Sequence, residues 1–531
     1  MMHKTVFYLL LSIGAFFLFY NISAQYLWED EAETAILAKS VLKEGVPKTF
    51  DGKNRIYLHI KDSLRSGDIW TFHPWLQFYL TAASFAISGK PTTFSARIPF
   101  ALLGFLSLIA LYILALTLFK DRSIALITLS LFVFSIPFIL HMRQCRYYAP
   151  AVFFTLWFIL SYINLIKNKK YSFLSFIVAG NFLFHSNYGT FLPVIFAFIL
   201  HYFIFYYKKI SSQKFIAALT ILFISTFPWF IYLKGYQHKG HINLHNLSHQ
   251  IQFYFRITYK YMFPLLFFII VFIVQLLRRK KRTLLSFYSS FPKNNMWLLL
   301  LIIISTFVFS LTGDQRFFRY ILHILPLFLI LEALLFREWF KDSQYFAPIA
   351  FILILFTNIL HYSAPTLLIS TLPSTTKQKL SALYPPGKLN RQLKETSFSP
   401  VYSYLYELTH SYKDPVEGMI TFLLQHAKPT DTIAIPYDNH PLMFYTNFKV
   451  FHLRYEKEVF ADWIVFQKGW FEEIYGNCEK SSFCQTILSN YEKFVIDYPD
   501  ILWNNMPEPT YHKFKTVTDA PNLIIYKKIK N

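Results

Sequence analysis

The chain has 531 residues, of which 54% are hydrophobic, 20% aromatic and only 15% charged, a composition that excludes a wholly soluble protein. The formal net charge of +22 raises the question of nucleic acid. However, the basic residues form short clusters between apolar runs and make no basic face interleaved with exposed aromatics, so we expect no nucleic-acid partner. The sequence predicts a polytopic membrane protein.

Apolar runs of about 18–24 residues recur through the first two thirds of the chain, each long enough to cross roughly 30 Å of hydrocarbon as a helix. A further apolar run, 73–89, is predicted to lie along the outer membrane surface. A cleaved signal peptide is the alternative interpretation of the first run. The eleven predicted spans are 5–24, 96–119, 123–141, 149–166, 171–187, 189–207, 213–233, 258–277, 295–312, 319–336 and 345–363.

Basic clusters between the spans predict the topology. With 73–89 on the surface, all of these clusters fall on the same side as Lys4, which the positive-inside rule assigns to the cytoplasm. We therefore predict a cytoplasmic N-terminus and an extracytoplasmic C-terminal domain, periplasmic if the membrane is a bacterial inner membrane. Loop 25–95 then faces outward. The clusters are 119–122, 167–170, 206–209, 278–282 and 337–341.

Loop 25–95 opens with an acidic cluster, in which Asp30 and Glu31 are flanked by Glu29 and Glu33. One interpretation is catalytic, because a carboxylate at the membrane boundary can remove a proton from an acceptor hydroxyl. The alternative is a solvated acidic turn at the start of a helix, where acids are favoured. For Glu29 and Glu33 we expect the second role.

Arginines on the same outer side are candidates for binding an anionic phosphate, because a guanidinium offers fixed bidentate contacts. Arg143 and Arg146 lie at the junction 141–148, and Arg319 lies in 313–320, with Arg316 close by. The alternative for these arginines is contact with lipid headgroups. Arg97, at the start of the second span, is expected to anchor that span at the outer interface.

The outer loop 234–250 is rich in histidine. His241, His245 and His249 are spaced to align on one helix face and to bind a metal, whereas Gly240 and the polar sequence favour a flexible loop that faces the acceptor. A divalent metal is therefore not indicated.

Composition changes after residue 364. Residues 364–390 are rich in Pro, Ser and Thr and are predicted to be a linker. Residues 391–531 are predicted to form a small α/β domain, with a helix in 414–431 and strands at 432–437, 493–499 and 522–528. Cys478 and Cys484 lie in this domain, and either a disulfide or two unpaired thiols is compatible with their spacing.

Five segments in order resemble one family. They are "WEDEAETAILAKSVLKEGVP" (28–47), "FHPWLQFYLTAASFAISG" (72–89), "ARIPFALLG" (96–104), "RQCRYYAPAVFF" (143–154) and "FFRYILHILPLFLI" (317–330). Together they resemble the GT-C superfamily of glycosyltransferases, which includes protein O-mannosyltransferases and the aminoarabinose transferase of lipid A. The family pattern is an Asp-Glu pair after the first span, followed by a surface helix, here 32–43, and a Gly-x-Pro.

The apolar runs and the resemblance together predict an all-α membrane domain (1–363) of about eleven transmembrane helices and outer-surface helices, followed by the small extracytoplasmic α/β domain. The resemblance implies a glycosyltransferase that uses a polyprenyl-phosphate sugar as co-substrate, with undecaprenyl phosphate as the carrier if the source is bacterial. We predict inversion at the anomeric carbon, because the reaction is a single displacement. Asp30 is then the base, and Glu31 orients Asp30 or the acceptor. The candidates for contact with the donor phosphate are Arg143, Arg146, Arg319 and His73.

One departure from the family concerns the second surface helix, which an acid-Lys-Pro triplet opens in the aminoarabinose branch. Here Phe72 and His73 precede Pro74, so His73 replaces the lysine only in part. The acceptor, whether lipid, glycan or protein, and the sugar are left open. Two other functions remain as alternatives: a flippase or transporter of lipid-linked sugars, and a non-catalytic scaffold of the cell envelope.

Overall fold

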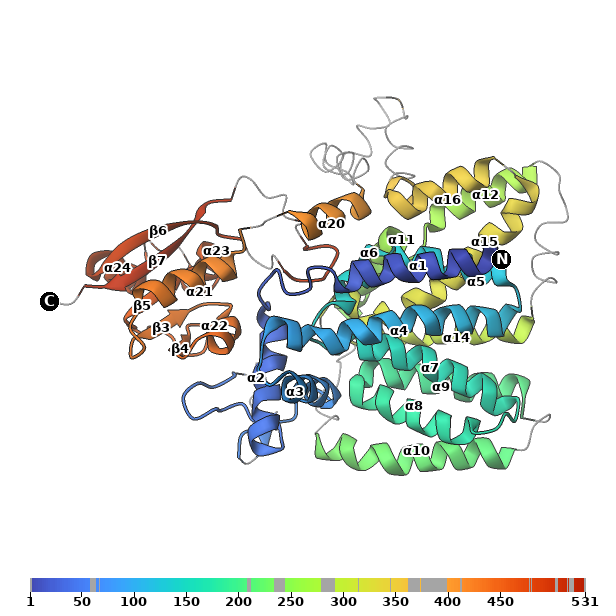
Figure 1. Cartoon of the computed structure of the whole chain (residues 1–531), viewed down its shortest axis with the longest axis horizontal. Coiled ribbons are helices and arrows are strands. Elements are labelled where there is room, and N and C mark those ends of the chain that lie inside the picture. The colour runs from blue at the N-terminus through green and yellow to red at the C-terminus, as the bar shows by residue number, and fades with distance from the viewer. Residues whose placement is uncertain are drawn as a thin grey trace.

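The computed structural model shows a helical domain followed by a small α/β domain (Figure 1). The predicted linker, the cluster 278–282 and residues 234–243 of the His-rich loop lie outside the described residues, apart from position 373. The structure describes residues 2–57, 64–65, 67–207, 212–233, 244–277, 292–313, 315–343, 345–361, 373, 399–410, 413–476, 478, 480–501, 505–512, 514 and 520–529.

The described residues contain six helices that are long and apolar enough to cross a membrane, or up to eight if each of two bent helix pairs is one span. The chain is therefore a multi-span membrane protein, although the predicted count of eleven spans is not confirmed. The six helices are α1 (Met2–Phe19), α4 (Thr93–Phe119), α7 (Tyr148–Ile166), α9 (Tyr188–Phe205), α10 (Ser212–Tyr232) and α14 (Lys293–Ser310).

Two predicted spans are bent, each next to a proline. The span predicted at 123–141 divides into α5 (Arg122–Val133) and α6 (Ile136–Met142), at 66° to each other, and Pro137 lies in the first turn of α6. Pro264 separates α11 (Leu244–Tyr261) from α12 (Leu265–Leu277), which meet at 71°. Proline lacks the amide hydrogen that a continuous helix requires, which explains why both breaks occur there.

Other predicted spans are shorter than expected. The span predicted at 319–336 begins with two 3₁₀ turns, η3 (Phe318–Tyr320) and η4 (Leu322–Ile324), and only then continues as α15 (Leu325–Asp342). Helices α8 (Ser172–Ser186) and α16 (Phe346–Phe356) are apolar but have only 15 and 11 residues.

Two helices lie across one end of the bundle. In Figure 1, α2 (Glu29–Glu44) runs across the long axes of α4 and α7, and α3 (Leu76–Ser88) lies beside it, seen end-on. With 13 residues, α3 is about 20 Å long, too short to cross roughly 30 Å of hydrocarbon. The position of 73–89 relative to the membrane stays a prediction. The strands β1 (Leu64–Arg65) and β2 (Ile69–Trp70) form a small hairpin between the two helices.

The boundaries of α2 differ from the prediction of 32–43, because the helix already begins at Glu29. The acidic residues therefore occupy its first turn. The helix ends at Gly45, whose φ of 76° is a left-handed conformation that glycine adopts without steric cost.

The C-terminal domain contains a five-stranded sheet of order β4-β3-β5-β7-β6. Strand β3 (Thr432–Ile435) is parallel to β4 (Lys449–His452) and β5 (Trp463–Phe466), whereas β7 (Asn522–Lys528) is antiparallel to β5 and to β6 (Tyr491–Pro499). The predicted strands correspond to β3, β6 and β7, and the predicted α/β class is confirmed. Strands β4 and β5 were not predicted. The helices are α20 (Pro400–Thr409), α21 (Pro415–His426), α22 (Asn439–Tyr445), α23 (Lys468–Tyr475) and α24 (Ser482–Asn490).

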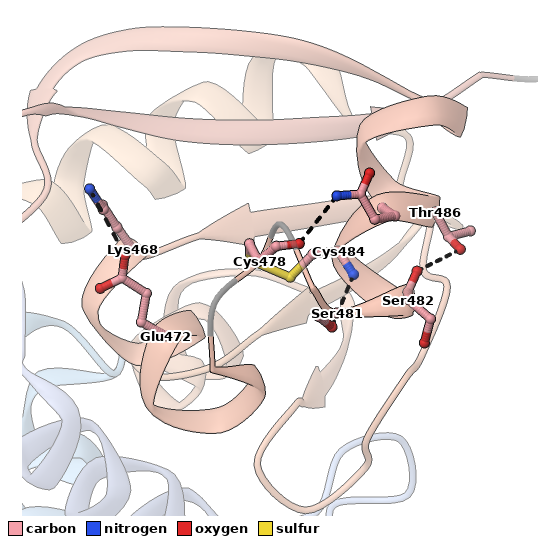
Figure 2. Close-up of a disulfide and its surroundings, with 8 residues drawn as sticks. Lys468, Glu472, Cys478, Ser481, Ser482, Cys484 and Thr486 are labelled. Atoms are coloured by element: carbon pink, nitrogen blue, oxygen red, sulfur yellow. Dashed lines mark hydrogen bonds and ion pairs between the residues drawn. A yellow bond between two sulfur atoms is a disulfide. The ribbon is translucent and has the colours of Figure 1, made fainter.

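A disulfide joins Cys478 to Cys484, with 5.2 Å between their Cα atoms (Figure 2). It closes the short connection between α23 and α24, and the hydroxyl of Ser481 accepts a hydrogen bond from the Cys484 amide at the start of α24. Of the two alternatives that the sequence left open, the structure shows the disulfide.

The C-terminal domain packs directly on the loop that carries α2. The ammonium group of Lys39 donates to the carbonyl of Phe444 at 2.8 Å, and the side chain of Asn54 exchanges hydrogen bonds of 2.9 Å with the main chain of Phe448 and Val450. Helix α22 lies against α2 (Figure 1). The start of α2 is therefore enclosed between the helical bundle and the C-terminal domain.

Candidate active site

The four carboxylates at the start of α2 point to four different partners. Successive residues of a helix are rotated by about 100°, so neighbouring side chains leave the helix in different directions. Each carboxylate consequently reaches a different element. The side chain of Asp30 is the most exposed, at 24%, compared with 12% for Glu33, 9% for Glu29 and 0% for Glu31.

Glu31 forms a buried ion pair with Arg97 of α4, with contacts of 2.6 and 2.8 Å. One of its oxygens also accepts a hydrogen bond from the main-chain amide of Cys145, at 2.7 Å. Arg97 in turn donates to the carbonyls of Ile22 and Gln25. Through Glu31, α2 is thus fixed to α4 and to the segment that leads into α7, as expected for Arg97 as an anchor.

Asp30 faces two arginines. Its carboxylate lies 3.1 Å from the guanidinium of Arg319 in η3 and 4.0 Å from that of Arg146. The hydroxyl of Tyr148, at the start of α7, lies 3.2 Å from Arg319 and adds a polar contact on the same side. Three distant parts of the chain therefore meet at Asp30.

Glu508 of the C-terminal domain holds η3 in place. Its carboxylate accepts hydrogen bonds from the amides of Phe318, at 2.9 Å, and Arg319, at 3.2 Å, and lies 3.9 Å from the Arg319 guanidinium. Burial raises the pKa of Glu508 to about 7, although Arg319 opposes the shift. Arg319 is thus held between one acid from each domain.

Glu33 binds the second arginine. Its carboxylate lies 2.6 Å from Arg146 and 3.9 Å from Nδ1 of His73. Burial raises the pKa of Glu33, and the positive charge of Arg146 opposes this shift. The His73 ring lies against Trp70, with 5.7 Å between the ring centres, so the segment before α3 also belongs to the site.

Glu29 pairs with His440 of α22, at 2.6 Å from Nδ1, and also accepts a hydrogen bond from the His440 amide at 3.2 Å. Burial alone would lower the pKa of His440, but Glu29, followed by Glu33 and Asp30, raises it. The expectation that Glu29 and Glu33 are solvated residues of a helix start is therefore wrong. Both are enclosed by the packing of other elements on α2.

Arg143 lies in a different environment. Its guanidinium donates to the carbonyls of Phe17, Leu18 and Tyr20 at 2.9–3.2 Å, and so satisfies main-chain groups at the end of α1. Arg316 is exposed. The structure therefore brings Asp30, Arg146, Arg319 and His73 together, with Glu31 directly behind them and Arg143 bound to α1.

Three buried hydrogen-bond donors near Glu33 have no partner among the described residues. They are Nε1 of Trp70, Nε2 of Gln77 and Nε of Arg146. Gln77 is adjacent to this arginine, because its Oε1 accepts from the amide of Tyr147 at 3.1 Å. Unsatisfied donors of this kind are costly in a protein interior. Donors without acceptors are what an anionic ligand requires.

A cavity of about 570 Å³ lies between α5, α6, α11, α15, α16 and the C-terminal domain. Apolar residues of α5, α6, α15 and α16 line much of it, together with Arg256 and Lys260 of α11 and the buried Glu332 of α15. Its wall includes Tyr261, whose ring lies 6.0 Å from that of Phe318 in η3. A cavity with both apolar and charged lining therefore borders the turn that carries Arg319.

Sequence reasoning missed Glu508, His440 and Gln77. None of them lies in a recognisable motif, because each reaches the site only through the packing of its own domain or helix. In the part of the chain that the structure describes, no group of three or more His, Cys, Asp or Glu residues is placed to hold a metal.

Comparisons with known proteins agree with this architecture. Residues 72–232 match the family model described as dolichyl-phosphate-mannose-protein mannosyltransferase. The chain has the GT-C glycosyltransferase fold. The crystal structure of ArnT from Cupriavidus metallidurans bound to undecaprenyl phosphate is 12% identical, covers 84% of this chain and 85% of its own, and has a TM-score of 0.53.

A second similar structure is the archaeal oligosaccharyltransferase AglB from Archaeoglobus fulgidus, in complex with an inhibitory peptide and a dolichol-phosphate. It is 11% identical, covers 95% of this chain and 74% of its own, and has a TM-score of 0.50. No curated protein matches the sequence. The predicted resemblance to GT-C glycosyltransferases is confirmed as a likeness in fold and in the sequence of residues 72–232.

Proposed function

We propose that this GT-C protein transfers a sugar from a polyprenyl-phosphate donor to an acceptor hydroxyl at the outer face of the cytoplasmic membrane. One observation carries the proposal. A partly exposed carboxylate, Asp30, lies between Arg146 and Arg319, at the end of the bundle where α2 and α3 lie. The N-terminus is then cytoplasmic and the C-terminal domain extracytoplasmic.

Asp30 is the proposed base, because it is the most exposed of the four acids and its ion pair of 3.1 Å with Arg319 is longer than the 2.6 Å pairs of the other three. Glu31 is tied to Arg97, Glu33 to Arg146, and Glu29 to His440. In this scheme Glu31 orients Asp30 by fixing the first turn of α2.

The donor phosphate is proposed to lie beside Arg146 and Arg319. Support comes from the unpartnered donors of Trp70, Gln77 and Arg146, since several N–H groups without acceptors favour an anion. His73 is a further candidate contact. Arg143 does not contact the phosphate in this scheme, because its guanidinium binds main-chain carbonyls at the end of α1. The adjacent cavity suits the apolar chain of a lipid carrier, and the undecaprenyl phosphate bound to ArnT and the dolichol-phosphate in AglB are ligands of that chemical class.

The proposed reaction is a single displacement. Asp30 accepts the proton of the acceptor hydroxyl, whose oxygen forms a new bond to the anomeric carbon as the bond from that carbon to the phosphate oxygen breaks. The electron pair leaves with polyprenyl phosphate, and the arginines stabilise the charge that develops on it. Attack opposite to the leaving group inverts the configuration at the anomeric carbon.

The decisive experiment uses the purified full-length protein in detergent with a panel of radiolabelled polyprenyl-phosphate sugars. Release of polyprenyl phosphate is compared between the wild type, Asp30→Asn and the control Glu44→Gln, which lies at the exposed end of the same helix and pairs with Lys48. We expect a fall of at least about 10²-fold for Asp30→Asn, with donor binding retained, and no change for Glu44→Gln.

Two results would contradict the proposal. Equal turnover by Asp30→Asn and the wild type would show that Asp30 is not the base. Tight donor binding without turnover in any variant, together with movement of the lipid-linked sugar across reconstituted vesicles, would favour the flippase.

A further inference from the structure

The C-terminal domain places a second polar cluster against α2. The residues that follow β3 and β5 meet at the carboxyl ends of these two parallel strands. From there the chain continues in opposite directions, because β3 leads through α22 to β4 on one side, whereas β5 leads through α23 and α24 to β6 on the other. In open α/β sheets, ligands bind in the crevice at such a point.

The side chains in this crevice are polar and buried. Gln467, after β5, donates to the carboxylate of Asp438, after β3, at 2.9 Å, and so joins the two strand ends. The rings of Tyr437 and Trp470 stack beside them, with 4.7 Å between their centres. Asp438 has a φ of 61°, in the left-handed region that non-glycine residues rarely adopt.

Several polar atoms of the crevice have no protein partner among the described residues. Asn439 is completely buried, yet neither its amide nitrogen nor its amide oxygen has a partner. Oε1 of Gln467 is likewise buried without a partner. Buried polar groups are normally satisfied, because each unmade hydrogen bond costs about 1–3 kcal/mol. A cluster of such groups at the strand ends therefore offers hydrogen-bonding capacity to a polar ligand.

The chemistry of these atoms differs from that of the three unpartnered donors near Glu33. Trp70, Gln77 and Arg146 offer donors only, as an anion requires. Asn439 offers a donor and an acceptor together, and Gln467 adds an acceptor. A ligand that both donates and accepts at neighbouring positions carries hydroxyl groups, as sugars do.

The second cluster lies directly beside the proposed reaction centre. His440, the neighbour of Asn439, pairs with Glu29 at 2.6 Å, and Glu29 precedes Asp30 in the first turn of α2. In a polyprenyl-phosphate sugar, the hydroxyl groups lie one glycosidic bond away from the phosphate. An anion subsite at Arg146 and Arg319 and a hydroxyl subsite linked to Glu29 through His440 therefore match one donor molecule.

We infer that the crevice at the ends of β3 and β5 binds the sugar of the donor, with Asn439 and Gln467 forming hydrogen bonds to its hydroxyl groups. This inference rests on the proposed function and assigns sugar recognition to the C-terminal domain. Asn439 is the first residue of α22 and is fully buried. The packing around the start of α22 must therefore open to admit the sugar.

The test measures binding instead of turnover, so that it does not depend on the catalytic step. In an Asp30→Asn background, the full-length protein is titrated with plain undecaprenyl phosphate and with undecaprenyl-phosphate sugars. The variants are Asn439→Leu, which keeps the side-chain volume, Gln467→Met as a second probe of the crevice, and Asn447→Leu as an exposed control in the same domain.

We expect Asn439→Leu and Gln467→Met to weaken binding of the sugar-bearing lipid by about tenfold and to leave binding of plain undecaprenyl phosphate unchanged. Asn439→Leu should not lower the melting temperature, because the native amide forms no hydrogen bond that would be lost. The Asn447→Leu control should bind both lipids like its parent.

Four results would overturn the inference. Equal weakening of both lipids, or a marked fall in melting temperature, would show that Asn439 is structural. Unchanged binding of every donor would show that the crevice does not contact the sugar. A rise only in the KM of the acceptor, measured with Asp30 restored, would assign the crevice to the acceptor. Failure of the proposed function is separate, since it would appear as turnover that does not depend on Asp30.

Discussion

Asp30 and Arg319 are 289 positions apart in the sequence, yet their side chains form an ion pair of 3.1 Å. The pair joins the first outer loop to the turn that precedes α15. Glu508 approaches the same arginine from the C-terminal domain, so three parts of the chain meet at one guanidinium.

Replacing Arg319 with glutamine should reduce kcat by at least about 10²-fold, because the variant loses a charge placed to stabilise the departing phosphate. Arg319→Lys should recover little of the loss, since a lysine cannot contact Asp30 and a phosphate with a planar fork. Steady-state release of polyprenyl phosphate measures the effect. Arg316→Gln, at an exposed position three residues earlier, is the matched control. Full activity of Arg319→Gln would remove this residue from the site.

Glu508 should make stability depend on pH. Its pKa in the folded protein is raised to about 7, above its usual value, so the protonated form favours the folded state. This contribution is complete below the usual pKa of a glutamate and is lost as the pH rises through about 7. The difference in melting temperature between the wild type and Glu508→Gln should therefore decrease as the pH rises from about 5 to about 8. A difference that is constant over this range would contradict the assignment.

Glu31 should prove essential for folding. The Glu31→Ala variant leaves Arg97 as an unpaired buried charge, at an expected cost of about 3–5 kcal/mol. We expect a large fall in the melting temperature in detergent, and partial recovery when Arg97→Met is added, because the charge is then removed as well. A stable but inactive Glu31→Ala would instead indicate a direct role in catalysis.

The disulfide should be present in the protein as isolated from an oxidising compartment. Alkylation after unfolding without reductant should label only Cys145, the remaining cysteine, and labelling after reduction should reveal all three. Replacing both Cys478 and Cys484 with serine should destabilise the C-terminal domain by about 2 kcal/mol, because the bridge closes a short loop. Labelling of three cysteines without reductant would contradict the bond and weaken the extracytoplasmic assignment of this domain.

Several features were predictable because they depend on local sequence. The apolar runs, the helix within 73–89 and the strands β3, β6 and β7 follow from residue patterns within short windows. The number of complete spans did not follow, because hydropathy does not show where Pro137 and Pro264 interrupt a helix. Strands β4 and β5 have only four residues each, too few for a reliable pattern.

For the site, the sequence alone determined that an acidic cluster and several arginines lie at the ends of apolar segments, since charge is expelled from hydrocarbon. It did not determine which charges meet. The direction of each carboxylate depends on the rotation of α2, and that rotation is set by the buried pair of Glu31 and Arg97. Only the tertiary structure brought Glu508 to η3 and His440 to α2, because long-range packing between domains leaves no periodic signal in the chain.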